Sequence, residues 1–320
     1  SSTGFDYADT SGIQPTQLAN PGLRWEKSEQ LDVNIDYAFA KSRIFGSVTY
    51  YQKKSSDLLL FLSLPTSSGF SGVWQNVGEV QNWGIEFSLT TKNINKKFKW
   101  QTSLNLAMNR NTVLDAASLP PDAFESGQPG EGRVIEGYPV GQSFLVEFAG
   151  VQAEDGQIGQ FDLNGAAVLD GGGNQVMIDV DGGTELFYDI NGNVMTFNDP
   201  TGGDFYGLHR KPMGSPLPSF YGGITNTLSF AGIELSFLFS GSYGNTIYDD
   251  AAKTQIGSWQ NNAQRREILD AWSPTNTDTD VPGLNNYTSV NSSRFLYDAS
   301  YIRLRSITLS YDIPKKALAK

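Results

Sequence analysis

The segment LDVNIDYAF, residues 31–39, places an apolar side chain at every second position from Leu31 to Phe39. A period of two is the pattern of a β-strand that has one apolar and one polar face. After the tripeptide Lys41-Ser42-Arg43 the alternation resumes over residues 44–50, IFGSVTY. The two segments therefore predict a β-hairpin whose strands share an apolar face.

The same alternation recurs along the chain and predicts seven strands. They cover residues 30–41, 43–53, 77–91, 98–109, 219–230, 233–243 and 300–313. Most are about 10 residues long, which is the length that a strand needs to cross a bilayer at a tilt. Alternation alone does not separate a sandwich from a barrel, because both have one apolar and one polar face.

The connections between the predicted strands alternate in length. Turns 41–43, 92–97 and 231–232 are short, whereas the excursions 54–76, 110–217 and 244–299 are long. Short periplasmic turns and long external loops are typical of outer-membrane barrels. Aromatic residues gather beside the short turns, where an interfacial girdle is expected: Tyr37, Phe39, Phe45, Phe98, Trp100 and Phe230. We therefore expect an all-β chain, residues 1–320, that forms part of an antiparallel transmembrane β-barrel.

Three segments depart from the regular pattern. Residues 144–151 are apolar and would break the inward–outward order if they crossed alone, so we place them inside excursion 110–217; half of a further spanning pair is the alternative. The apolar positions of 300–313 change phase, which predicts a β-bulge near Arg305-Ser306. Asn226 falls on the apolar face of 219–230, and the sequence offers no reason for it.

Composition excludes several functions. The net charge is −11 and the basic residues come in short pairs, so a nucleic-acid role lacks its basic surface. The chain has no cysteine, which rules out disulfides and thiolate chemistry. Its single histidine, His209, lies beside Arg210-Lys211 in a predicted loop, and the acidic residues are scattered. We therefore predict no catalytic site and no enzyme.

Short motifs follow one another over almost the whole chain. They are NPGLRWE at 20–26 with Glu29-Gln30, YYQKK at 50–54 with DLL at 57–59, NVG at 76–78 with Asn82 and GIE at 84–86, GYPVG at 137–141, and SSRF at 292–295 with SYIRLR at 300–305. Each motif is weak by itself. In this order and spacing they resemble the SusC/RagA family of TonB-linked outer-membrane transporters.

The resemblance implies a bacterial outer-membrane barrel of about 22 strands with an N-terminal plug, of which this chain would be an internal, C-terminal portion. It implies TonB-energised import of large nutrients, with glycan fragments the first choice and oligopeptides the second. The implied partners are a SusD-like surface lipoprotein lid, the TonB complex, and surrounding lipid and lipopolysaccharide. A passive porin or adhesin barrel and a soluble sugar-binding sandwich are the alternatives. We expect the lid to cover apolar loop residues, including Phe148 and Phe187.

Two groups of loop residues are candidate binding sites. Asp189, Asn191 and Asn193 stand at alternate positions, as oxygen ligands do at the start of a calcium loop, and Asp199 follows near a later ligand position. A glycine-containing Asx turn without metal is the alternative. The second group could stack on sugar rings, although loop packing and interfacial anchoring also explain aromatic residues there; it comprises Trp74, Tyr206, Tyr243, Trp259 and Trp272.

Overall fold

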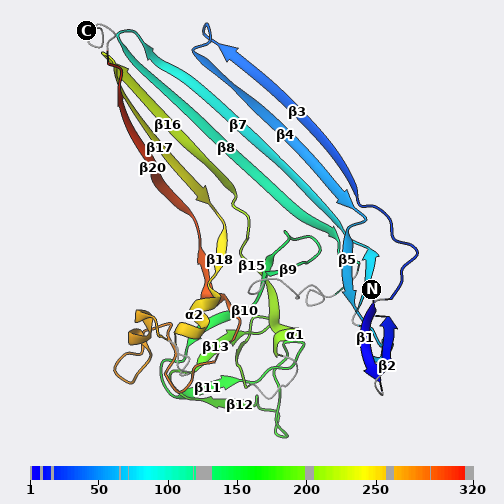
Figure 1. Cartoon of the computed structure of the whole chain (residues 1–320). Coiled ribbons are helices and arrows are strands. Elements are labelled where there is room, and N and C mark those ends of the chain that lie inside the picture. Colours follow the sequence, from blue (N-terminus) through cyan, green and yellow to red (C-terminus); the bar gives the residue numbers. More distant parts are fainter. Residues whose placement is uncertain are drawn as a thin grey trace.

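The computed structural model describes residues 2–7, 10–15, 18–64, 66–70, 72–117, 119, 132–198, 205–256, 263–288 and 290–313. Its largest element is a seven-stranded antiparallel sheet (Figure 1). In spatial order the strands are β3 (Lys27–Phe39), β4 (Ile44–Ser56), β7 (Glu79–Asn95), β8 (Phe98–Asp115), β16 (Phe220–Phe230), β17 (Ile233–Tyr243) and β20 (Tyr301–Tyr311). Each strand is hydrogen-bonded to the strands beside it in this order, which is also the order in which the seven strands follow one another along the chain. Each overlaps one predicted range, although several strand ends differ from the predicted ones.

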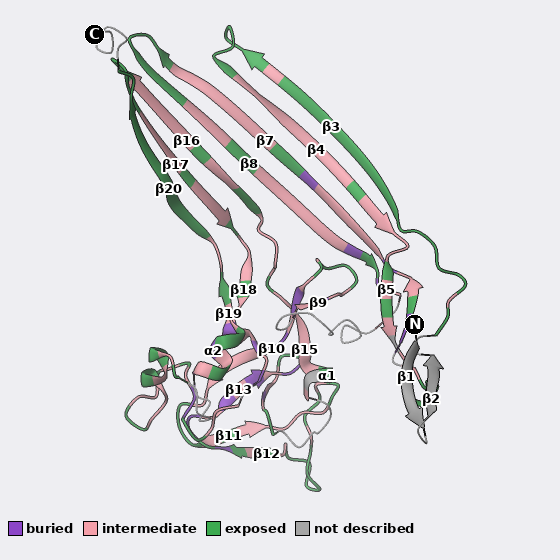
Figure 2. Ribbon diagram, viewed as in Figure 1, coloured by how far each residue is buried: buried purple, intermediate pink, exposed green. Residues whose placement is uncertain are grey.

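The sheet has one apolar face and one polar face. The cross-strand row Ile35, Val48, Phe87, Leu106 and Gly222 lies on the apolar face. Many apolar side chains on this face are exposed to solvent. On β20, for example, Ile302 is 80% exposed and Leu309 is 71% exposed. In Figure 2 the sheet is mainly exposed or intermediate, and the buried residues concentrate elsewhere. Such a bare apolar face is stable only against an apolar medium or a partner.

The short turns lie together at one end of the sheet, at the top of Figure 1, which we call the turn end. There Ala231 (φ 50°) and Gly232 (φ 84°) join β16 to β17. Two consecutive residues with positive φ form the tight turn that matches the right-handed twist of paired strands. The opposite end, where the long excursions begin, is the loop end.

Two predicted irregularities now have a physical account. Leu238 pairs with Ser306 and Phe239 with Leu304, so Arg305 is the extra residue of a β-bulge and the prediction is confirmed. Asn226 lies on the apolar face, but its Oδ1 accepts hydrogen bonds from Trp100 Nε1 at 2.9 Å and Thr102 Oγ1 at 2.7 Å. Its amide oxygen is therefore satisfied within the sheet.

The chain before β3 and the long excursions form small elements of their own. They are the hairpins β1–β2 (Ser2–Tyr7, Thr10–Pro15) and β5–β6 (Leu59–Ser63, Gly72–Asn76), with a 3₁₀ turn at Thr66–Ser68, and β9 (Gly132–Arg133), β10 (Gln142–Val151), β11 (Gly156–Gly159), β12 (Met177–Val180), β13 (Glu185–Tyr188), β14 (Val194–Thr196), α1 (Phe205–His209), β15 (Arg210–Met213), β18 (Thr246–Tyr248), α2 (Asp250–Gln255), two 3₁₀ turns at Arg266–Asp270 and Ser293–Phe295, and β19 (Leu296–Asp298). Within the described ranges, no helix is long and apolar enough to cross a membrane.

Strand β10 contains the apolar segment 144–151, and it does not join the main sheet. It pairs with β9, β13 and β15 in a separate five-stranded sheet. The placement of this segment inside excursion 110–217 is therefore confirmed, and the alternative of a further spanning pair is wrong. The reason is that β10 finds its hydrogen-bond partners within its own excursion.

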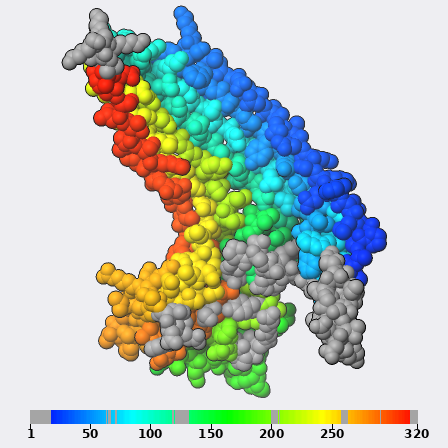
Figure 3. Space-filling view, in the orientation of Figure 1, coloured from blue at the N-terminus to red at the C-terminus, as the bar shows by residue number. Residues whose placement is uncertain are grey.

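The described parts of 132–215 and 244–299 pack together into what we call the loop unit, seen at one end of the wall of strands in Figure 3. One core contains Val146, Phe187 and Met195 from the first excursion and Val290 from the second. Val146 N also donates to Asn291 O at 3.2 Å. The two excursions thus share a core rather than forming independent loops.

Candidate functional sites

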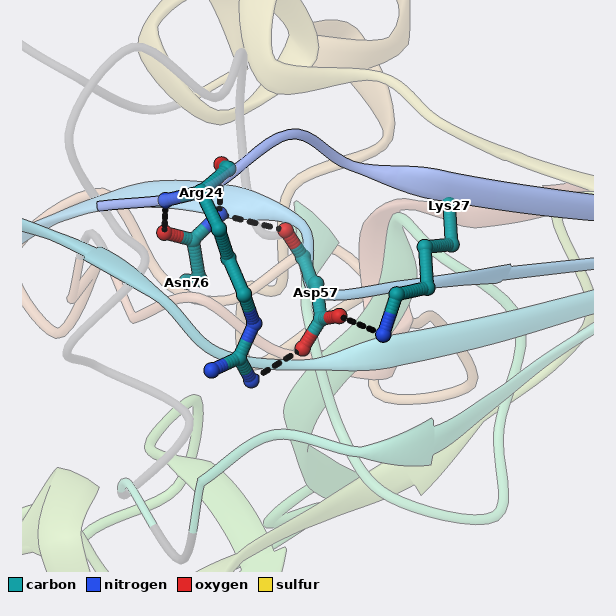
Figure 4. A network of polar contacts seen from close by, with 4 residues as sticks. All are labelled: Arg24, Lys27, Asp57 and Asn76. Carbon is teal, nitrogen blue, oxygen red and sulfur yellow. Dashed lines mark hydrogen bonds and ion pairs between the residues drawn. The ribbon is translucent and has the colours of Figure 1, made fainter. Parts of the chain in front are cut away.

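A network of polar contacts joins the chain before β3 to the hairpin β5–β6 (Figure 4). Asn76 Oδ1 accepts a hydrogen bond from Arg24 N at 2.8 Å, and Asn76 Nδ2 donates to the carbonyl oxygens of Arg24 at 2.6 Å and Asp57 at 2.9 Å. The Asp57 carboxylate pairs with Arg24 at 2.5 Å and Lys27 at 3.0 Å. Hydrogen bonds from these two cations lower the pKa of Asp57 to about 2. We call Arg24, Lys27, Asp57 and Asn76 the rim latch.

The rim latch gives three sequence motifs one structural role. NPGLRWE, DLL and NVG are separated in the chain, yet they supply Arg24, Asp57 and Asn76 respectively. Glu26 of the first motif also accepts a hydrogen bond from Leu59 N at 2.8 Å. These contacts hold β5–β6 at the loop end of the sheet.

The polar face carries a chain of hydrogen-bonded side chains, which we call the ladder, near the loop end. Tyr51 donates its hydroxyl hydrogen to Asn109 Oδ1 at 2.9 Å, and Asn109 Nδ2 donates to the Tyr221 hydroxyl at 2.8 Å. Next to the ladder, Glu86 and Asn105 contribute to the lining of a hollow of about 280 Å³. This face therefore presents hydroxyl, amide and carboxylate groups, which suit a hydrated interior.

A buried ion pair ties the two excursions of the loop unit. Arg294 donates to Glu185 Oε1 at 2.8 Å, with the side chains 7% and 2% exposed. Thr288 donates to the other carboxylate oxygen through its N–H at 2.9 Å and through its hydroxyl. Burial raises the pKa of Glu185, while Arg294 and Thr288 oppose that shift. The sequence analysis missed Glu185; the motif SSRF, which contains Arg294, was the only signal.

The predicted calcium residues form a hairpin turn stabilised by Asp189. Its Oδ1 accepts hydrogen bonds from Asn191 N at 2.8 Å and Asn193 N at 2.7 Å, and its Oδ2 accepts one from Asn193 Nδ2 at 3.0 Å. Gly192, with φ 90°, adopts the left-handed conformation that this turn requires. The carboxylate is therefore already engaged by its own loop, as in the metal-free Asx turn.

The same turn occurs three times in the loop unit. Asp162 and Asp170, like Asp189, each accept two backbone N–H bonds on Oδ1, from the second and fourth residues after the aspartate. In all three the hydrogen bonds to the carboxylate lower the aspartate pKa, against the opposing effect of burial. This repetition explains the calcium-like spacing as a turn motif.

The described residues contain no group of three or more His, Asp or Glu arranged to hold a metal ion. Asp199, the fourth predicted ligand, lies outside the described residues. Calcium binding by Asp189, Asn191 and Asn193 accordingly stays a prediction. His209 Nδ1 accepts a hydrogen bond from Ile190 N at 3.4 Å, so the histidine contacts this turn.

The predicted substrate aromatics do not gather at one place. Trp74 packs edge-on against Phe61 at 5.3 Å on hairpin β5–β6 and is 37% exposed. Tyr243 stacks on Phe220 at 5.4 Å, on the apolar face of the sheet. Trp272 donates from Nε1 to Ala153 O at 2.9 Å. Trp259 and the side chain of Tyr206 lie outside the described residues. A role for these residues in binding substrate stays a prediction.

Two apolar loop residues that we expected a lid to cover are covered wholly or partly by the loop unit itself. Phe187 has no exposed surface, and Phe148 packs against it with the ring centroids 6.3 Å apart. The expectation is wrong for Phe187, which the core of the loop unit buries completely, whereas Phe148 is only half-buried and its contact with a lid stays a prediction. Other apolar side chains take the exposed positions: Leu163, Leu169, Met177 and Leu269.

Residues 2–143 match the family described as TonB dependent receptor-like, beta-barrel. TonB-dependent receptor P3 of Formosa agariphila is 35% identical over 322 residues, covering 97% of this chain and 29% of that protein. TonB-dependent receptor SusC of Bacteroides thetaiotaomicron is 27% identical over 327 residues, covering 96% and 28% respectively. The chain thus spans less than a third of the length of these relatives.

The fold is shared with solved structures of a peptide transporter. The structure described as the RagAB peptide transporter superposes with a TM-score of 0.75 at 23% identity, covering 100% of this chain and 32% of that one. A structure of the RagAB peptide importer in the "open-open" state gives a TM-score of 0.74 at 22% identity. The chain is a β-barrel portion of a TonB-dependent receptor of the SusC/RagA family. Barrels of this family lie in the bacterial outer membrane, and the family consists of receptors rather than enzymes.

Proposed function

We propose that the chain is the barrel wall and loop portion of a TonB-energised importer of large nutrients. The division of the molecule supports this best: a sheet with a bare apolar face carries, at its loop end, a unit built from excursions 110–217 and 244–299. The apolar face suits lipid, and the polar face suits a hydrated interior. The segment that contacts TonB and the plug would lie in the remainder of the receptor.

The loop unit is the proposed docking surface for a SusD-like surface lipoprotein lid. An arm formed by residues 156–180 extends β11 and β12 and exposes Leu163 (48%), Leu169 (58%) and Met177 (46%). Apolar residues exposed on an arm that ends a folded unit are typical of interfaces. The name of the relative RagAB and its "open-open" state are in keeping with a two-component mouth.

Excision of the arm tests the docking proposal. Gly156 and Val180 are cross-strand partners, so residues 157–179 can be replaced by Asn-Gly while the surrounding backbone keeps its course. We expect the full-length receptor to insert normally but to lose most of its lid in pull-downs with mild detergent. A receptor that retains its lid fully after the excision would show that the arm is not the docking surface.

The substrate class follows from the resemblance and from the relatives. Glycan fragments are our first choice, and the similarity to a RagAB peptide transporter favours oligopeptides as the second. Uptake of labelled oligosaccharides and oligopeptides by cells with and without TonB separates both choices from a passive porin. Import that continues unchanged without TonB would contradict the energised mechanism.

A further inference from the structure

The apolar face contains an open hollow of about 460 Å³ towards the loop end. Its floor is the cross-strand pair Gly222–Gly241. Leu106 on β8 and Ile302 on β20 flank the floor in the same row. The stacked rings of Phe220 and Tyr243 close the side nearest the loop end, and Ile224 and Phe239 close the other. We call this depression the glycine hollow.

Neither glycine of the floor can carry a side chain without a clash. A Cβ atom on Gly222 would lie 2.1 Å from Asn105 O, and one on Gly241 would lie 2.7 Å from Tyr301 O. Both contacts are with backbone atoms of neighbouring strands, which cannot move aside without breaking the hydrogen bonds between the strands. The close approach of the strands therefore keeps the hollow bare.

The glycine hollow opens on the surface that faces lipid in barrels of this family. On β16, Phe220 at the loop-end side of the hollow and Phe230 at the turn end are ten residues apart. At roughly 3.3 Å per residue and a tilt of about 40°, that separation is roughly 25 Å, the height of the lipid-facing band between the aromatic girdles. The hollow thus lies just inside the girdle at the loop end, on the level of the outer acyl chains.

A cation, Arg110, lies on the same face as the hollow, on its loop-end side. Arg110 is four residues beyond Leu106 on β8, roughly 13 Å along the strand. Its guanidinium donates to the carbonyl oxygens of Asn109 at 2.9 Å, Pro218 at 3.1 Å and Ser219 at 3.2 Å. Within the described residues it forms no ion pair with a carboxylate. Neutral carbonyl groups orient the guanidinium, and no carboxylate in the described part of the chain compensates its charge.

We propose that the glycine hollow and Arg110 bind one lipid A molecule of the outer leaflet. An acyl chain would fill the hollow over Gly222 and Gly241, and a phosphate of the headgroup would accept hydrogen bonds from Arg110. The order of the two features along β8 matches the order of acyl chain and headgroup in a lipid of that leaflet. The proposal rests on the membrane location of the barrel and not on what the receptor imports.

Lipid retention by the full-length receptor tests this site. Receptor in nanodiscs containing lipid A or phosphatidylglycerol is released into mild detergent, and bound lipid is counted by native mass spectrometry. Arg110→Gln removes the charge, and Ile302→Trp fills the hollow from its flank. We expect each change to reduce retained lipid A about tenfold, the effect of losing one charge-assisted hydrogen bond or its equivalent.

Matched controls keep the result specific. Arg303→Gln removes a charge from the polar face, since Arg303 pairs with Ser240. Ile307→Trp enlarges an apolar residue on the same strand that lies nearer the turn end than Ile302. Both controls should retain lipid A as the wild type does. Equal retention by Arg110→Gln and the wild type, or equal retention of phosphatidylglycerol and lipid A, would overturn the proposal.

Discussion

The side chain of Asn76 holds both backbone polar groups of Arg24, accepting from its N–H at 2.8 Å and donating to its carbonyl at 2.6 Å. The amide thereby reproduces the pair of hydrogen bonds that a neighbouring strand would make. It does so across 52 residues of sequence, between the approach to β3 and the end of β6. Asn76 is therefore a central contact among those that attach hairpin β5–β6 to the main sheet.

Asn76→Ala should loosen hairpin β5–β6 without unfolding the barrel. The change removes three hydrogen bonds and leaves the backbone of Arg24 to water. We expect protease cleavage near Thr66–Ser68 to become at least several-fold faster, as measured on the full-length receptor. Gln75→Ala, in the same strand, is the control and should leave the rate unchanged.

The rim latch should also depend on pH. The folded pKa of Asp57 is lowered to about 2 from 3.8, so its stabilising effect is complete above the unfolded value and is lost as pH falls through about 2. Because the chain has no cysteine, an environment-sensitive dye at Ser68→Cys can report hairpin opening. We expect a transition between pH 4 and pH 2. Asp57→Asn should abolish it; a transition that persists in this variant would place its origin elsewhere.

Cysteine substitution should reveal the two faces of the sheet. Ile35, Val48, Phe87 and Leu104 lie on the apolar face, and their neighbours Asn34, Thr49, Glu86 and Asn105 lie on the polar face. In the intact receptor a water-soluble thiol reagent should label the second set and spare the first, because successive side chains point to opposite faces. Equal labelling of both sets would refute the lipid-facing assignment.

An arginine should cost far more at Phe87 than at Ser88. Phe87 lies on the apolar face, where Arg is destabilising by about 2–4 kcal/mol if the site lies near the bilayer midplane. Ser88 faces the polar side, where the guanidinium stays hydrated. Folding titrations into lipid vesicles should show this difference between Phe87→Arg and Ser88→Arg, and similar free energies would argue against it.

The buried pair in the loop unit should behave as a coupled unit. Arg294→Met leaves the Glu185 carboxylate buried without its cation and should destabilise the loop unit by about 3–5 kcal/mol. Adding Glu185→Gln should recover much of that loss, because no uncompensated charge remains. Hydrogen exchange of the β13 amides measures both effects. Additive losses in the double variant would show that the two groups do not interact.

The sequence by itself determined the main sheet and its two faces. Alternation from Leu31 to Phe39 and in six other segments defines the strands, because a pleat sends successive side chains to opposite sides. The bulge at Arg305 was predicted for the same reason: an extra residue shifts the phase of the pattern. Strand ends were less well defined; β8 continues to Asp115, beyond the apolar positions that marked it.

Only the tertiary structure decided which distant residues meet. The rim latch and the Glu185–Arg294 pair each join segments that no local period connects. Local spacing also left two interpretations open at Asp189, and the structure shows that its carboxylate accepts the backbone hydrogen bonds of an Asx turn. Periodicity reports the direction of a side chain relative to its own strand. Partners at long range depend on how strands register and how excursions pack, and a single sequence carries no periodic record of either.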